Sequence, residues 1–128
     1  MAAPVTEPAA LQIEFGDRFL SDLRAALAAR PEASRFLIGA ASVPAFMGVP
    51  DAPVNVAGLA VSDTCKEVVD GLVRRTVPRE NLVTLTGPWL VSREALTGAL
   101  DRVGAGSARD PLGLFRASGV PIHVSTAP

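Results

Sequence analysis

Residues 54–72, with the sequence VNVAGLAVSDTCKEVVDGL, decide the predicted fold. The run over 54–61 is almost entirely apolar, which is typical of a strand that is buried on both faces. Apolar residues then recur at helical spacing, and Thr64 and Glu67 have the spacing of a capping box at a helix N-terminus. The stretch therefore predicts a buried strand followed by a helix over residues 65–76.

Strands and helices alternate from this stretch to the C-terminus, and the pattern extends to its N-terminal side. Further elements are expected as strands at 11–15, 36–41, 82–86 and 120–125 and as helices at 17–30, 93–103 and about 110–118. Gly87-Pro88 is expected to end the strand at 82–86. This order predicts an α/β domain with a small, mostly parallel sheet of about four or five strands flanked by helices. The alternative is an α+β two-layer sandwich with the helices on one face.

The 128 residues are enough for one domain. Residues 1–10 are rich in Ala and Pro without periodicity, so we expect a flexible arm there and a single domain over 11–128. The N-terminus lacks the basic and apolar regions of a signal peptide. The longest uncharged run, 36–50, is too short to cross a bilayer. We therefore expect a cytoplasmic protein with no membrane partner.

The composition argues against several classes of function. Twelve Lys and Arg residues face thirteen Asp and Glu, so there is no basic surface for nucleic acid. Eleven of the twelve basic residues are Arg, and Lys66, His123 and Cys65 are the sole residues of their types. A single cysteine excludes an internal disulfide and, with a single histidine, a standard zinc site. Without a glycine-rich phosphate loop, we expect no cofactor and no metal.

Polar residues gather where the carboxyl ends of parallel strands would form a pocket. A ligand or anion site there would use Ser62, Asp63, Thr64, Thr86 and Ser92. The competing interpretation is that these side chains cap helices.

Three residues are weak candidates for catalysis. Asp63 ends a buried strand, His123 lies in the last strand, and Cys65 would lie in the first turn of a helix, whose dipole stabilises a thiolate. Packing of Cys65 on the apolar stripe of that helix is the competing interpretation.

An apolar, proline-rich loop at 42–53 suggests association with a partner. It carries Phe46, Met47 and Val49, and Trp89 is a second possible anchor at an interface. With 48% hydrophobic residues and few catalytic residue types, the leading hypothesis is a non-catalytic protein. It would act as a homo-oligomer, accessory subunit or assembly component, with itself or another subunit as partner. The alternative is a small enzyme or ligand-binding domain with its pocket at the carboxyl ends of the strands.

Overall fold

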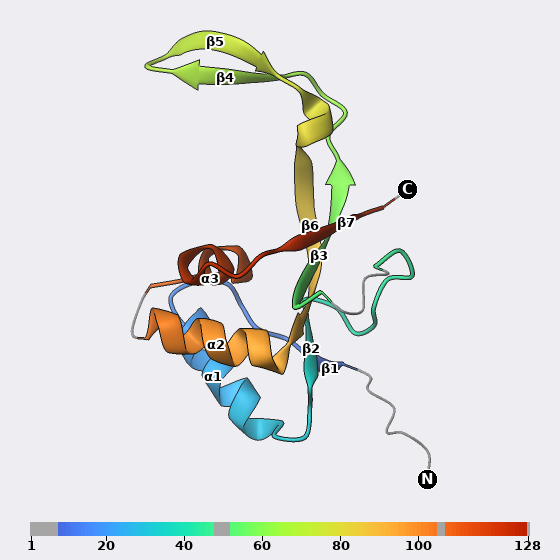
Figure 1. Ribbon diagram of the computed structural model, residues 1–128, viewed down its shortest axis with the longest axis vertical. Helices are drawn as coiled ribbons and strands as arrows, with labels where there is room; N and C mark the ends of the chain where they lie inside the picture. Colours follow the sequence, from blue (N-terminus) through green and yellow to red (C-terminus); the bar gives the residue numbers. More distant parts are fainter. Residues whose placement is uncertain (1–7, 48–51, 105–106, 128) are drawn as a thin grey trace.

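One five-stranded sheet organises the chain, whose computed structural model describes residues 8–47, 52–104 and 107–127 (Figure 1). In spatial order its strands are β1 (Ala9–Leu11), β2 (Arg35–Ile38), β6 (Val83–Ser92), β3 (Val54–Ala60) and β7 (His123–Thr126). The pairs β1–β2 and β3–β7 are parallel, and β6 runs antiparallel to both β2 and β3. Four strands therefore share one direction, which confirms the predicted mostly parallel sheet.

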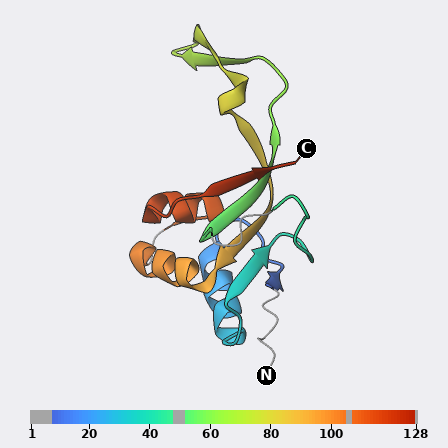
Figure 2. The same ribbon diagram turned by 45° about the vertical axis from the view of Figure 1, so that its right-hand side comes forward.

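The helices of the described residues, α1 (Phe19–Ala29), α2 (Arg93–Val103) and α3 (Pro111–Ser118), all pack on one face of the sheet (Figure 2). The main core lies between the two layers and is built around the fully buried rings of Phe19, Phe36 and Phe115. A smaller apolar cluster lies on the opposite face. This layering is the arrangement of the predicted alternative, a two-layer sandwich.

The ends of α2 and α3 match their sequence. The Ser92 hydroxyl accepts a hydrogen bond from the Ala95 amide at 3.0 Å, so Ser92 is the N-cap of α2. Asp110 caps α3 in the same way, and Pro111 occupies its first turn. These caps are confirmed.

Arginine side chains hold the C-termini of all three described helices. Arg93 donates to carbonyls at the end of α1, Arg24 to carbonyls at the end of α2, and Arg102 to the Ser118 carbonyl at the end of α3. A guanidinium carries five donors and a permanent charge, so it satisfies several free carbonyls and opposes the helix dipole. Three of the eleven arginines thus stabilise helix ends.

The helix predicted over 65–76 is wrong, because these residues form a β-hairpin. Strands β4 (Cys65–Val69) and β5 (Leu72–Val77) pair antiparallel and project from the end of the sheet. Asp70 and Gly71 connect them with φ angles of 52° and 78°, the positive values of a two-residue hairpin turn.

Strand β6 is longer than predicted, because it continues through Gly87-Pro88 to Ser92. The register with β3 shifts between Val56 and Gly58, so Pro88 lies at an irregularity where the ladder needs no amide donor. Before β6, a short 3₁₀ helix, η1 (Arg79–Asn81), joins it to the hairpin.

The N-terminal boundaries also differ from those expected. Strand β1 is Ala9–Leu11, so it begins inside the segment predicted as a flexible arm. Residues 12–15, which were predicted to continue a strand from residue 11, are not in a strand. The rest of that arm, residues 1–7, lies outside the described residues. Among the described helices, none has the length and apolar character needed to cross a membrane.

Candidate ligand site

A cleft opens at the carboxyl ends of the parallel strands β3 and β7. Its volume is about 260 Å³. The lining residues come from β3, η1, β6 and β7, and they are Ala60, Arg79, Glu80, Asn81, Leu82, Val83, Val124 and Thr126. Ligands of open sheets with parallel strands bind at this edge. The cleft is therefore the strongest candidate for a ligand site.

Arg79 provides the fixed positive charge of the cleft. Its Nη1 donates to the Ser62 carbonyl at 2.6 Å, which ties η1 to the segment that leaves β3. Among the described residues, this is the one hydrogen bond of the guanidinium, so most of its five donors remain available there. A guanidinium suits the oxygens of phosphate or carboxylate. Glu80 is the acidic residue of the lining, so a bound anion experiences both charges.

The predicted cluster Ser62, Asp63 and Thr64 follows β3 and leads into the hairpin, where all three residues are exposed. The capping box at Thr64 is wrong, because Glu67 instead forms an ion pair with Arg75 across the hairpin at 2.8 Å.

Cys65 lies in β4, so no helix dipole acts on its thiol. The Sγ–H donates to the Asp63 carbonyl at 3.7 Å. The argument for a dipole-stabilised thiolate is therefore wrong, and so is the competing packing on a helical stripe.

Thr86 and Ser92 lie far apart along β6. The Thr86 hydroxyl is within hydrogen-bonding distance of the Ala57 carbonyl at 3.2 Å, which places it at the irregular part of the β3–β6 ladder. Ser92 pairs with Arg35 at the start of β2. It thus lies at the amino edge of the parallel strands, opposite the cleft.

His123 begins β7 and is the register partner of Asn55 near the start of β3. Asp63 and Cys65 follow the other end of β3, so the structure separates His123 from the other two catalytic candidates. Within the described ranges, no group of three or more His, Cys, Asp or Glu residues has an arrangement suited to a metal ion.

The predicted interface residues that the structure describes turn inward. Trp89 is 5% exposed, and its ring lies 6.3 Å from that of Phe115 in the main core. Met47 is buried in the smaller cluster, and Phe46 packs against it. These contacts make Trp89 and Met47 core residues. Val49 lies outside the described residues.

Two residues with potential roles, Arg79 and Asn55, were not among the predicted site residues. Arg79 follows Pro78 in a segment whose hairpin context was missed. Asn55 is a polar residue inside the apolar run 54–61. An amide inside such a run is the sequence signal that indicates a buried polar group.

The fold is similar to that of three enzymes of known structure. The chain superposes on 4-diphosphocytidyl-2C-methyl-D-erythritol synthase from Anaerococcus prevotii DSM 20548 with a TM-score of 0.69 and 14% identity, covering 92% of this chain and 60% of that one. A second synthase of that name gives 0.61 and 20%, with coverages of 88% and 59%.

The 2-C-methyl-D-erythritol 4-phosphate cytidylyltransferase from Francisella tularensis gives a TM-score of 0.58 and 16% identity, with coverages of 88% and 60%. The chain thus spans about 60% of the length of these enzymes. Neither a protein-family model nor a curated protein sequence matches it.

These similarities correct the predicted function. A non-catalytic protein that works by association was expected, whereas the solved structures that share this fold are enzymes. The finding favours the predicted alternative, a small enzyme or ligand-binding domain with its pocket at the carboxyl ends of the strands.

Proposed function

We propose that this chain is a ligand-binding domain of the cytidylyltransferase fold that holds a phosphorylated polyol in the cleft beside Arg79. The observation that carries the proposal is the position of this guanidinium at the carboxyl ends of β3 and β7. The compound named for one of the similar enzymes, 2-C-methyl-D-erythritol 4-phosphate, is the first ligand to test.

The chemistry of the cleft suits such a ligand. The Arg79 guanidinium provides donors and charge for phosphate oxygens, while Asn81 and Thr126 provide polar groups for hydroxyls. Val83, Val124 and neighbouring aliphatic groups form an apolar wall. A mixed lining of this kind is typical of sites for small molecules.

Isothermal titration with 2-C-methyl-D-erythritol 4-phosphate tests the proposal. We expect Arg79→Ala to weaken binding about 10- to 100-fold, because it removes a charged hydrogen-bonding partner of the phosphate. 2-C-methyl-D-erythritol without its phosphate should bind poorly to both proteins.

Arg116→Ala is the matched control, because Arg116 is an exposed arginine on α3 and does not line the cleft. It should bind the ligand as the unaltered chain does. Equal affinities of the Arg79→Ala and unaltered proteins would contradict the proposed site, and so would the absence of any phosphate-dependent binding.

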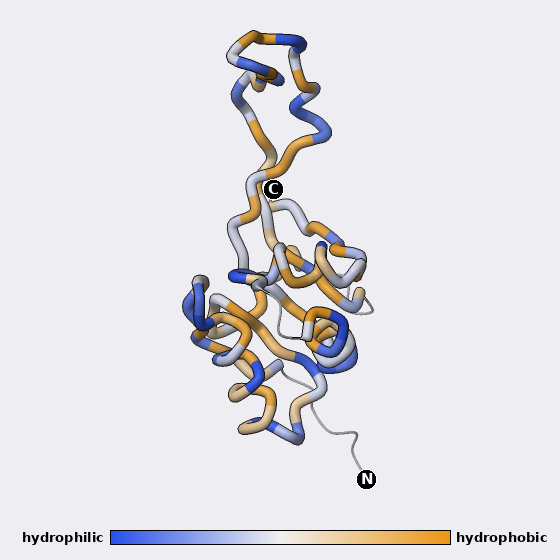
Figure 3. Tube along the Cα trace, turned by 90° about the vertical axis from the view of Figure 1, so that its left-hand side faces the viewer, coloured by the Kyte–Doolittle hydropathy of each residue, from blue (hydrophilic) through white to orange (hydrophobic). Residues whose placement is uncertain are grey.

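We also propose that the partner of this domain is a second copy of itself, contacted through the hairpin. Among the described residues, the exposed large apolar side chains are Phe15, Leu59, Val68, Val69, Leu72 and Val73. All except Phe15 lie on the hairpin or at the end of β3 that leads to it, and Figure 3 shows apolar stretches along this projection. A two-fold axis pairs such a patch with itself, and an isolated two-stranded hairpin gains stability from that burial.

Sedimentation velocity at micromolar concentration tests the proposed self-association. We expect a dimer that the double variant Val68→Thr/Leu72→Thr converts to a monomer, since threonine keeps the β-propensity and removes apolar surface. Phe15→Gln, which removes an exposed apolar group elsewhere, should leave the dimer intact. A monomeric unaltered chain would refute the self-association, and so would a dimer that persists in the double variant.

A further inference from the structure

The sheet face opposite the helices combines an apolar patch with polar side chains. Leu37, Ala57 and Leu90 form its apolar floor, with Met47 packed on it. Asn55 lies between Leu90 on β6 and His123 on β7 in the strand register. The face thus combines an apolar patch with an amide and an imidazole.

Asn55 has one satisfied and one unsatisfied polar atom. The side chain is 1% exposed, and its Oδ1 accepts a hydrogen bond from the Ser125 hydroxyl at 3.0 Å. Its Nδ2 is buried and has no hydrogen-bond partner among the described residues. If the side-chain amide were rotated by 180°, Oδ1 would lack a hydrogen-bond partner instead of Nδ2. One polar atom therefore stays without a partner in either orientation.

A buried amide donor without a partner costs free energy, and natural proteins retain such groups where they have a use. Ser125 is itself 7% exposed and comes from the neighbouring strand, so the amide is held in place by a second buried side chain. Asn55 is therefore a preorganised polar group rather than a mobile surface group.

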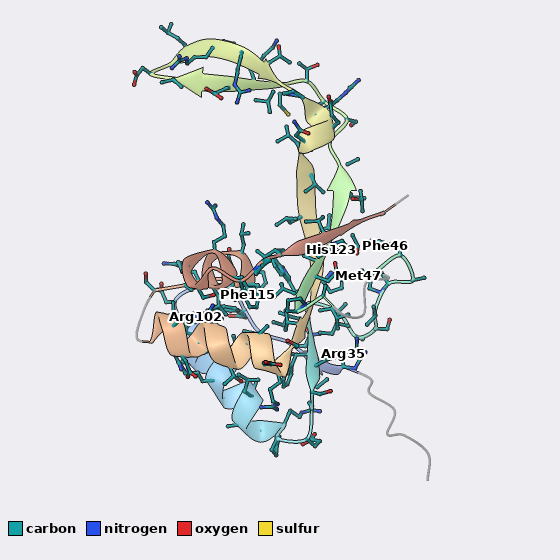
Figure 4. The ribbon with its side chains drawn as sticks, viewed as in Figure 1. Arg35, Phe46, Met47, Arg102, Phe115 and His123 are labelled. Carbon is teal, nitrogen blue, oxygen red and sulfur yellow. The ribbon has the colours of Figure 1, made fainter. Side chains whose placement is uncertain are left out.

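The apolar floor of this face is covered by the described segment 40–47. Within the described segment 40–47, Phe46 and Met47 contact the floor through apolar side chains. Its backbone hydrogen bond, from the Met47 amide to the Pro44 carbonyl, is internal to the segment. Figure 4 shows Phe46 and Met47 at the level of His123, on the side of the sheet away from the helices.

We propose that this face is a second ligand site, distinct from the cleft at Arg79, which binds an organic carboxylate with a small apolar body. A carboxylate oxygen accepts from Asn55 Nδ2, and the apolar body replaces Met47 on Leu37 and Leu90. His123 is exposed beside Asn55 and provides a further N–H donor at the rim. The polar and apolar parts of the floor thus match the two parts of the ligand.

The side-chain amide signals in ¹H–¹⁵N spectra give a direct readout. The chain contains only two asparagines and one glutamine, Asn55, Asn81 and Gln12, so three NH₂ pairs are expected. Titration of the full chain with sodium benzoate should shift the Asn55 pair saturably and leave the Asn81 and Gln12 pairs in place. Benzylammonium has the same ring but no acceptor oxygen, and it should leave the Asn55 pair unmoved.

The variant Asn55→Val assigns the Asn55 pair by its disappearance and tests the role of the amide. The affinity of this variant for benzoate can be measured from the backbone amide signals of β7. It should fall at least about tenfold, since valine fits a strand but its side chain donates no hydrogen bond. Asn81→Ala should bind benzoate as the unaltered chain does. If Asn55→Val fails to fold, the titration of the unaltered chain decides alone.

Three results would overturn the inference. An Asn55 pair that benzoate does not move would show that the amide takes no ligand, as when a trapped water satisfies it. An equal shift with benzylammonium would show that the acceptor oxygen is irrelevant. Unchanged affinity of a folded Asn55→Val variant would place the benzoate elsewhere.

Discussion

Replacing Phe115 with alanine is expected to lower the free energy of unfolding by about 3 to 5 kcal/mol, the largest loss we expect from any single substitution considered. The ring is fully buried between α3 and the sheet and lies 6.3 Å from the Trp89 ring. Helix α3 has eight residues, too few for a stable isolated helix, so its structure depends on this packing. Truncation also leaves a cavity in the main core.

Urea unfolding followed by circular dichroism measures this loss. Arg116→Ala is the control, because it alters the next residue of the same helix at an exposed position and should change stability by no more than about 0.5 kcal/mol. A loss below about 1 kcal/mol for Phe115→Ala, with an unchanged m-value, would mean that α3 does not anchor the layer as described.

The second large effect is expected at Arg93, where alanine should cost about 2 to 3 kcal/mol. Its Nε donates to the Ala33 carbonyl at 2.6 Å, and its Nη2 reaches two carbonyls at the C-terminus of α1. The guanidinium also lies over the Phe36 ring, 5.0 Å from the centroid. The substitution removes a helix cap and a cation–π contact together.

Arg93→Lys separates charge from geometry. Lysine keeps the positive charge near the end of α1 but loses the planar fork, so about half of the stability loss should remain. Thermal unfolding of both variants provides the measurement. Equal stability of Arg93→Ala and the unaltered chain would show that the α1 terminus is adequately solvated without its guanidinium.

The elements that contribute to the core were predictable, because their apolar patterns reflect burial. The strand at 54–61, the helix at 93–103 with its Ser92 cap, and Asp110 with Pro111 all follow local rules that tertiary packing reinforces.

The secondary-structure prediction failed where apolar residues are not part of the core. Val68 and Leu72 suggested the buried stripe of a helix, yet they are 57% and 71% exposed on the hairpin. The Asp70-Gly71 pair between valine-rich flanks is the local pattern that favours a hairpin, and a helix would have placed Gly71 in its interior. Here turn chemistry outweighs helical periodicity.

The candidate site was predictable in position but not in its key residue. Parallel strands imply a pocket at their carboxyl ends, and Ser62 does approach it through its carbonyl. Arg79 joins the site only because the hairpin reverses the chain and η1 returns to the end of β3. A long-range contact of this kind leaves no local pattern in the sequence.

The most direct test of the proposed function is a crystal structure of the chain with 2-C-methyl-D-erythritol 4-phosphate. We predict that the phosphate lies in the cleft between β3, η1 and β7, with its oxygens accepting hydrogen bonds from the Arg79 guanidinium. A phosphate bound at another site, with Arg79 uninvolved, would contradict the proposal.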